Sequence, residues 1–252
     1  MELNIVSFNI RCCDDENGNS INERAPRLFN VINPLNPDLI GLQEYRLQWE
    51  EHIEKYFGNE YDMFSKYRSE TTSDVEASPI LWKKDKFDLI KTEYFWLSDT
   101  PKVESKGWDV GAGCFRMCLS AVLKDKKTGI LFNFMNTHFG FGDEGQIASA
   151  KLIYDMSKKI SDYPTFITGD FNMLPESPGY KKMTEYFTDV NAATVNDKRG
   201  TYHGYKPKEI SQHIDYCFVD NKITPVNVAL IDDIVDGKYP SDHFGLNIKL
   251  SL

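Results

Sequence analysis

One short stretch, Phe166-Ile-Thr-Gly-Asp170-Phe-Asn172, constrains this chain most, because it combines an apolar run with two polar side chains at its end. The run from Thr165 to Thr168 contains only β-branched and aromatic residues, which favours a buried strand. With strand alternation, Asp170 and Asn172 point the same way, and a carboxylate beside an amide can hold a water molecule and accept its proton. The alternative is an Asx-rich turn, in which both residues are only turn formers.

The same arrangement, an apolar run that ends in a polar side chain, recurs along the chain. The polar residues at or near the ends of predicted strands are Asn9, Glu44, His138, Asp170, Asn172, Asp215, Asp242 and His243. Loops at strand ends gather on one rim of a sheet sandwich, so we expect these side chains to converge. Taken singly, each also fits a structural role as a surface acid, a turn amide or a packed histidine.

Apolar periodicity predicts many strands in hairpins and few helices. Strands are expected at residues 3–8, 39–42, 61–65, 77–82, 87–96, 114–123, 130–135, 165–168, 213–219, 225–231 and 244–250, and helices at 23–32, 47–57, 143–160 and 180–187. The strands at 77–82 and 87–96 are expected to form a hairpin, and Asp143 and Gln146 to form a capping box. This order predicts an α/β fold in which two mixed sheets pack face to face with helices on the outer faces.

Length and charge narrow the class of protein. A chain of 252 residues without an evident linker predicts one domain over 1–252. The net charge of -9 argues against non-specific binding of long nucleic acid, because such binding needs many Lys and Arg contacts to phosphates. An acidic site also suits a divalent cation, so the excess of acidic residues favours a metal-dependent protein with a small substrate. No signal peptide and no apolar run of about 18 residues is evident, so we expect a cytoplasmic protein without a membrane span.

The five cysteines form no C-x-x-C pair and no even set, which favours reduced thiols. Cys114 and Cys118 would be zinc ligands only with two further ligands from elsewhere in the chain.

Six short motifs appear together in one order. They are Ser7-Phe-Asn9, Gly41-Leu-Gln-Glu44, Asn136-Thr-His138, Gly169-Asp170-Phe-Asn172, Ile214-Asp215-Tyr216 and Ser241-Asp242-His243. In these motifs the chain resembles the endonuclease/exonuclease/phosphatase superfamily, the group of deoxyribonuclease I, from about residue 3 to residue 250. The resemblance implies a four-layered α/β sandwich. Phe95-Trp-Leu-Ser98 and Lys106-Gly-Trp-Asp109 resemble a bacterial branch of the superfamily.

The resemblance implies a divalent-metal site. Glu44 would be the main ligand of Mg²⁺ or Mn²⁺, with Asn9 beside it, since a hard cation favours carboxylate oxygen. Asp242 would support the metal or the loop that carries His243.

The resemblance also implies the catalytic groups. Asp170, oriented with Asn172, would align and deprotonate the attacking water for in-line displacement at phosphorus. His243 would donate to a non-bridging phosphate oxygen, with Asp215 holding its ring and keeping it protonated. His138 would be a second contact to the phosphate or the leaving group.

Residues on the substrate side follow less directly from the motifs. Glu76 is expected to pair with His138, and Arg116 is either a phosphate-binding residue or a solvated Arg at a strand edge. A set of aromatic and histidine side chains forms either a rim over the site or part of the core: Trp108, Phe139, Phe141, Tyr202 and His203.

The chain departs from its relatives on this side of the site. Relatives in this branch often carry Arg at the positions of His213 and Gln146, and a second His where Phe139-Gly-Phe141 stands here. Their preference for substrate charge therefore does not transfer to this chain.

The sequence thus predicts a metal-dependent phosphoric ester hydrolase, a phosphodiesterase or phosphatase, acting on a small or modest-sized phosphate ester. The alternative enzyme is a nuclease acting on DNA or RNA. The alternative of another class is a binding protein of this fold that has lost turnover, which the intact motifs disfavour. Ser241-Asp242-His243 is not a serine-hydrolase triad, because adjacent strand residues point to opposite faces.

Overall fold

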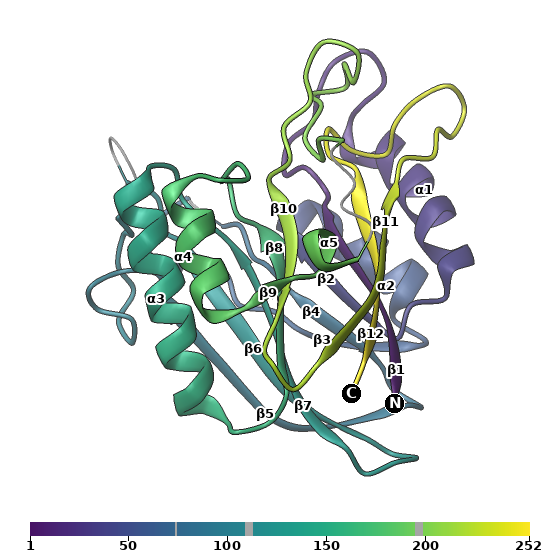
Figure 1. The fold of residues 1–252 in the computed structure, drawn as a ribbon. Helices are drawn as coiled ribbons and strands as arrows, with labels where there is room; N and C mark the ends of the chain where they lie inside the picture. The colour runs from purple at the N-terminus through teal and green to yellow at the C-terminus, as the bar shows by residue number, and fades with distance from the viewer. Residues whose placement is uncertain (74, 109–112, 195–198) are drawn as a thin grey trace.

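Two six-stranded β-sheets packed face to face form the centre of the molecule (Figure 1). The computed structural model describes residues 1–73, 75–108, 113–194 and 199–252. Parts of three predicted loops, including Asp74, Asp109 and residues 195–198, lie outside the described residues. The first sheet has the order β11-β12-β1-β2-β4-β3, and the second has the order β5-β6-β7-β8-β10-β9. Both sheets are mixed, with β1 parallel to β2 and β7 parallel to β8.

The strand bounds agree with most of the predicted runs. In the first sheet the strands are β1 (Glu2–Asn9), β2 (Leu39–Gln43), β3 (Tyr61–Phe64), β4 (Ile80–Lys83), β11 (Thr224–Ile231) and β12 (Gly245–Ser251). In the second they are β5 (Phe87–Trp96), β6 (Met117–Asp125), β7 (Leu131–His138), β8 (Thr165–Asp170), β9 (Thr188–Asp189) and β10 (Asp215–Val219).

Helices cover the outer face of each sheet, which makes four layers in total (Figure 1). α1 (Ile21–Ile32) and α2 (Glu50–Phe57), with the 3-10 turns η1 (Asn33–Leu35) and η2 (Leu47–Trp49), pack on the first sheet. α3 (Asp143–Ile160) and α4 (Pro178–Tyr186) pack on the second, and the short α5 (Val190–Ala193) follows β9. The predicted fold class, two mixed sheets with helices outside, is confirmed.

The core between the sheets follows from strand alternation. Phe132 and Phe134 on β7 belong to the same buried cluster as Ile5 of β1 and Ile248 of β12, and all four side chains are fully buried. At about 25 cal/mol per Å² of buried apolar surface, such side chains contribute about 1.5–3 kcal/mol each. The core therefore fixes the two sheets against each other.

The predicted hairpin between residues 77–82 and 87–96 is wrong. β4 pairs with β2 and β3 in the first sheet, whereas β5 pairs with β6 in the second. Trp82 and Phe87 both lie in the core between the sheets. The short connection therefore crosses from one sheet to the other instead of turning within one.

The predicted capping box of Asp143 and Gln146 is also wrong. The N-cap of α3 is Gly142, with φ of 96°, and no side chain caps the helix. The Gln146 amide instead donates to the carbonyls of Gly140 (3.1 Å) and Asn172 (2.7 Å), because the loop after β8 lies against this end of α3.

Asn136 connects the two sheets near the ends of the parallel strands. Its amide nitrogen donates to the carbonyls of Leu42 (2.8 Å) and Pro79 (3.0 Å) of the first sheet. Its amide oxygen accepts from Gln43 Nε2 (2.8 Å) and Thr168 Oγ1 (3.0 Å). All four hydrogen-bonding positions of the side chain are used, and the whole group is buried.

Gly41 allows this close approach of the sheets. A Cβ atom at Gly41 would lie 2.5 Å from Thr168 Oγ1 and 2.8 Å from Asn136 Oδ1. A larger residue would therefore separate the sheets at the point where they carry the polar strand ends.

Replacing Asn136 by Ala should lower the free energy of unfolding by about 2–4 kcal/mol, because four buried polar groups each lose a hydrogen bond. Urea denaturation measures the change, with the exposed Asn59→Ala as a matched control. A loss below about 1 kcal/mol would show that the sheets do not depend on this amide.

Candidate active site

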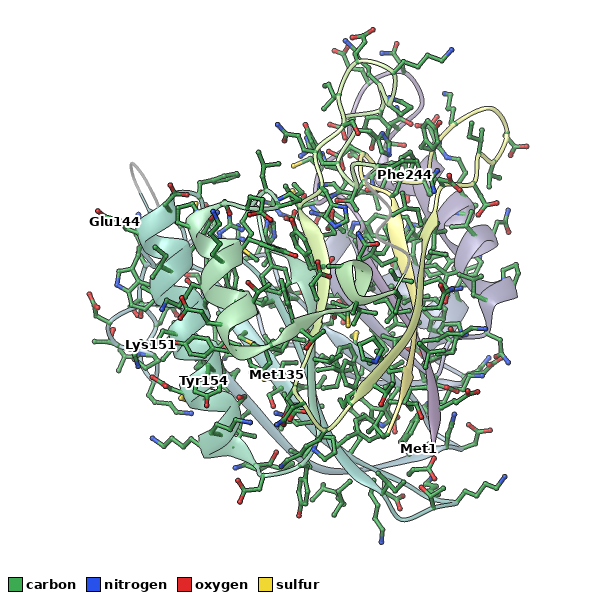
Figure 2. The ribbon with its side chains drawn as sticks, in the orientation of Figure 1. Met1, Met135, Glu144, Lys151, Tyr154 and Phe244 are labelled. Carbon is green, nitrogen blue, oxygen red and sulfur yellow. The ribbon has the colours of Figure 1, made fainter. Side chains whose placement is uncertain are left out.

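The polar strand ends gather around a pocket of about 390 Å³ at one end of the sandwich. Phe244, the residue after His243, lies at the upper end of the sheets in Figure 2, whereas Met1 lies at the lower end. Eight of the predicted site residues line the pocket: Glu44, Glu76, Arg116, His138, Asp170, Asn172, Asp242 and His243. Asn9 and Asp215 are buried beside it, in contact with lining residues.

Strand pairing explains why these residues meet. Asn9 lies opposite Gln43 at the ends of the parallel strands β1 and β2, so Glu44 follows directly. In the second sheet Asp170 lies opposite both His138 and Asp215. Because the sheets face each other, the carboxyl ends of two parallel pairs come together.

Two of the predicted site residues have left-handed backbone, Glu44 (φ 61°) and Asn172 (φ 48°), as does the pocket-lining Arg11 (φ 61°). For Glu44 this conformation is strained, which costs about 1–3 kcal/mol and is a feature of functional sites. Asn tolerates it well. The prediction that Asp170 and Asn172 share a strand face is wrong, because β8 ends at Asp170. The Asn172 N–H donates to Asp170 Oδ1 (3.0 Å) in an Asx turn, which therefore coexists with the site.

The Asn9 amide joins the two carboxylates that come from opposite sheets. Its Nδ2 donates to Glu44 Oε1 (3.0 Å) and to Asp170 Oδ2 (3.0 Å). The Cys12 N–H donates to Glu44 Oε2 (2.8 Å). Burial by itself would raise the pKa of Glu44, but these N–H donors help to hold it below the ordinary value. Glu44 is therefore an anion held in a fixed position.

Asp170 is flanked by two histidines. Its Oδ2 lies 3.6 Å from His138 Nε2 and 3.8 Å from His243 Nε2. Burial raises the pKa of Asp170 to about 7, and the Asp215 carboxylate acts in the same direction. Such a carboxyl can accept a proton near neutral pH.

The pKa values of His138 and His243 are shifted in opposite directions. Burial, together with the Arg116 guanidinium, holds the pKa of His138 well below its ordinary value. Burial would also lower the pKa of His243, but Asp215, with its Oδ2 2.9 Å from Nδ1, raises it to about 10. His243 is therefore protonated at neutral pH, with Nδ1–H donated to Asp215 and Nε2 at 3.8 Å from Asp170 Oδ2.

Two groups of described residues bring possible metal ligands together, and they share Asp170. In the first, Glu44, His138 and Asp170 place ligand atoms within 4.8 Å of one another; the second contains Asp170, Asp215 and His243. The second suits a cation less well, because Asp215 raises the pKa of His243 and so keeps both ring nitrogens protonated. The first suits a hard divalent cation, since it offers an ionised carboxylate at an open pocket.

Some predicted residues have other partners. Glu76 does not pair with His138; it accepts from Arg46 (2.9 Å) and Arg68 (3.1 Å), since their loops meet there. Asp242 lines the pocket but lies outside both groups of possible ligands, with its Oδ2 3.8 Å from Arg11 Nε.

The predicted aromatic rim is present only in part. Phe141 and Tyr202 line the pocket, and the Arg116 guanidinium lies 5.9 Å from the Phe141 ring centre. Phe139 and His203 are buried, so they belong to the core. Trp108 donates to Asp99 Oδ1 (3.0 Å) and lines a small neighbouring cavity instead of the pocket.

Several residues that line the pocket were not predicted as site residues, namely Arg11, Cys12, Arg68, Gln212 and Ile214. Arg11 follows Asn9 by two residues, so the polar strand end could have included it. Arg68 comes from a loop, and no local pattern marks it.

The fold and this set of residues define the deoxyribonuclease I-like class of α/β sandwiches. A family model described as "Endonuclease/Exonuclease/phosphatase family" matches residues 6–243. The chain belongs to this family, whose members hydrolyse phosphoester bonds. In the part of the chain that the structure describes, no helix is long and apolar enough to cross a membrane.

Solved structures with close similarity come from Bacteroides thetaiotaomicron. A family member of that organism has a TM-score of 0.92 and 27% identity, covering 99% of this chain and 97% of its own. Its mannosyl-6-phosphatase has a TM-score of 0.89 and 28% identity, covering 99% and 100%. A curated relative, the uncharacterized protein L388 of Acanthamoeba polyphaga mimivirus, is 32% identical over 157 residues, which are 59% of this chain. The chain spans 58% of that relative's length.

Replacing Asp215 by Asn should lower the pKa of His243 from about 10 toward its ordinary 6.5, because the carboxylate that stabilises the imidazolium is lost. Imidazole NMR signals followed against pH measure this shift. At neutral pH the free energy of unfolding should fall by about 3 kcal/mol.

The pH dependence of the free energy of unfolding distinguishes loss of the His243–Asp215 pair from a general packing defect. The folded pKa of His243 is the higher one, so the stabilisation is fully present below about pH 6.5 and is lost as the pH rises through about 10. A difference between wild type and Asp215→Asn that stayed constant across this range would contradict the pairing.

Proposed function

We propose that this chain is a divalent-metal-dependent phosphoric ester hydrolase that acts on small phosphate esters, with one catalytic domain over residues 1–252. The observation that carries the proposal is the position of Asp170 Oδ2, which lies 3.0 Å from Asn9 Nδ2 and within 3.8 Å of the Nε2 atoms of both histidines. One carboxylate with a pKa near 7 thus lies where a nucleophilic water and a phosphoryl group would meet.

Asp170 acts as the general base in this proposal. The water oxygen forms a bond to phosphorus, its proton passes to Asp170, and the bond from phosphorus to the alcohol oxygen breaks. The leaving alcohol takes a proton, so that an ester and water give an alcohol and phosphate. The Asn172 N–H fixes the second oxygen of Asp170 and so directs the accepting one at the water.

The two histidines and Arg116 bind the phosphoryl oxygens. His243 donates from Nε2, because its Nδ1 is held by Asp215, and it remains charged up to about pH 10. Fixed donors of this kind stabilise the charge of the transition state without reorganisation. His138 lies on the other side of Asp170 and contacts the phosphate or the leaving group.

Glu44 would hold the divalent cation, Mg²⁺ or Mn²⁺, with Asn9 beside it. When bound, the cation would polarise a phosphoryl oxygen and offset its charge. We propose that Asp242 supports the loop of His243 next to Arg11.

A small substrate is favoured over DNA or RNA by two findings. The net charge of -9 opposes a long polyanion. A relative of 28% identity that aligns over 99% of this chain is a mannosyl-6-phosphatase, which acts on a small phosphomonoester.

Replacing Asp170 by Asn should lower kcat for p-nitrophenyl phosphate or bis-p-nitrophenyl phosphate by about 10²–10⁴-fold, because the general base is lost. The assay compares Mg²⁺, Mn²⁺ and EDTA, with the exposed Asp155→Asn on α3 as the matched control.

Glu44→Gln should weaken the rise in melting temperature that the metal gives.

Three outcomes would change the assignment. Preferred cleavage of plasmid DNA would favour a nuclease. A metal-dependent rise in melting temperature without turnover of any ester would favour a binding protein of this fold. Full activity of Asp170→Asn would refute the general base.

A further inference from the structure

A groove of about 530 Å³ continues from the candidate active pocket, with which it shares Arg11, Tyr202 and Asp242. Two other cavities beside the pocket hold about 10 Å³ each, which is room for one water molecule at most. The groove lies in the size range of small-molecule sites. It therefore has room for the part of a substrate that extends beyond the phosphate.

Three segments far apart in the sequence form the walls of the groove. They are the loop after β1, the loop before β10 and the loop between β11 and β12, which rise together at the upper end of Figure 1. Hydrogen bonds connect them: Tyr205 Oη to Asp15 Oδ2 (3.3 Å), Lys238 Nζ to the Asn17 carbonyl (2.6 Å) and the His203 N–H to the Asp242 carbonyl (2.9 Å).

Arg24 holds the first of these walls in shape. Its guanidinium is fully buried and donates to four backbone carbonyls of the loop after β1, those of Ile10 (2.5 Å), Arg11 (3.0 Å), Cys13 (2.7 Å) and Asn19 (2.8 Å). A wall ordered before the ligand arrives avoids the entropy cost of ordering it on binding. The groove is therefore preformed.

The lining suits hydroxyl groups. Glu16 and Asn17 offer carboxylate and amide oxygens that accept from hydroxyls. Asp15 and Asn19 also line the groove, but their side-chain oxygens already accept from Arg11 and Arg27. Tyr202 adds an aromatic ring at the junction with the pocket, where it lies 5.0 Å from the His243 ring. An aromatic ring packs against the C–H face of a sugar, and the hydroxyl groups at the edge of the sugar then stay available for hydrogen bonds.

The charge of the lining disfavours a second phosphate. Arg11 is neutralised by Asp15, with two nitrogen-oxygen distances of 3.0 Å. Glu16 adds an exposed carboxylate, against the exposed Lys206, and Asp242 adds a buried carboxyl group that lies 3.8 Å from Arg11. An anionic leaving group would meet like charge there, whereas an uncharged one would not.

We propose that this groove binds the leaving group of the substrate and selects an uncharged, hydroxyl-rich alcohol, so that the preferred substrates are sugar monophosphates. The selection rests on the proposed phosphoester hydrolysis in the adjoining pocket. Glu16 and the Asp15–Arg11 pair exclude sugars that carry a second phosphate.

The test compares glucose 6-phosphate, glucose 1,6-bisphosphate and p-nitrophenyl phosphate with wild type and Glu16→Lys. In wild type, kcat/KM for the monophosphate should exceed that for the bisphosphate at least about tenfold. Glu16→Lys should lower this ratio about fivefold, because it replaces a repulsive charge by an attractive one. Glu60→Lys, the same change at an exposed residue beside β3, should leave the ratio as in wild type.

The outcomes separate this inference from the proposed function. If p-nitrophenyl phosphate is hydrolysed but the bisphosphate is cleaved as well as the monophosphate, or the ratio is the same in Glu16→Lys, the groove does not select the leaving group, and the hydrolase assignment stands. If none of the three esters is hydrolysed with Mg²⁺ or Mn²⁺, the proposed function fails and this inference fails with it.

Discussion

The Asn136 amide, which joins the two sheets at their polar ends, is the interaction on which the candidate site depends. It uses all four of its hydrogen-bonding positions, and Gly41 leaves the space for it. Glu44 follows a strand of one sheet and Asp170 ends a strand of the other. A shift of one sheet against the other would therefore separate these carboxylates, and the Asn9 amide could no longer bridge them.

Burial gives the site its chemistry because it acts differently on each group. Asp170 gains proton affinity from burial, whereas Glu44 remains an anion because His138 and the N–H donors of Cys12 and Asn9 offset the effect of burial on its pKa. His243 becomes a stable cation chiefly through Asp215, whereas burial and the Arg116 guanidinium lower the pKa of His138, which favours its uncharged form. A base, an anion and a proton donor thus lie within a few ångströms of one another, which is the arrangement that general acid-base chemistry requires.

The loops above the sheets add what the strands cannot provide. The strand ends form the pocket, and they lie within residues 6–243, which the endonuclease/exonuclease/phosphatase family model matches. Variation in the loops changes the surface next to the pocket without disturbing the core. Here Arg24 and a few hydrogen bonds between loops shape an acidic groove, so the region beside the pocket has a chemistry of its own.

Local pattern in the sequence determined the strands, the two-sheet fold and the polar residues at the strand ends, because alternation and a terminal polar residue are properties of neighbouring residues. The six motifs in order also indicated the family. Pairing between distant segments was decided by the tertiary structure alone. It set β4 and β5 in different sheets, gave Glu76 two arginines instead of His138, and placed Gln146 against the loop after β8. The groove likewise exists only in the folded chain, since the loop after β1 meets two loops from the far end of the sequence, as in the contact of Asp15 with Tyr205, 190 residues away. No local pattern encodes that contact.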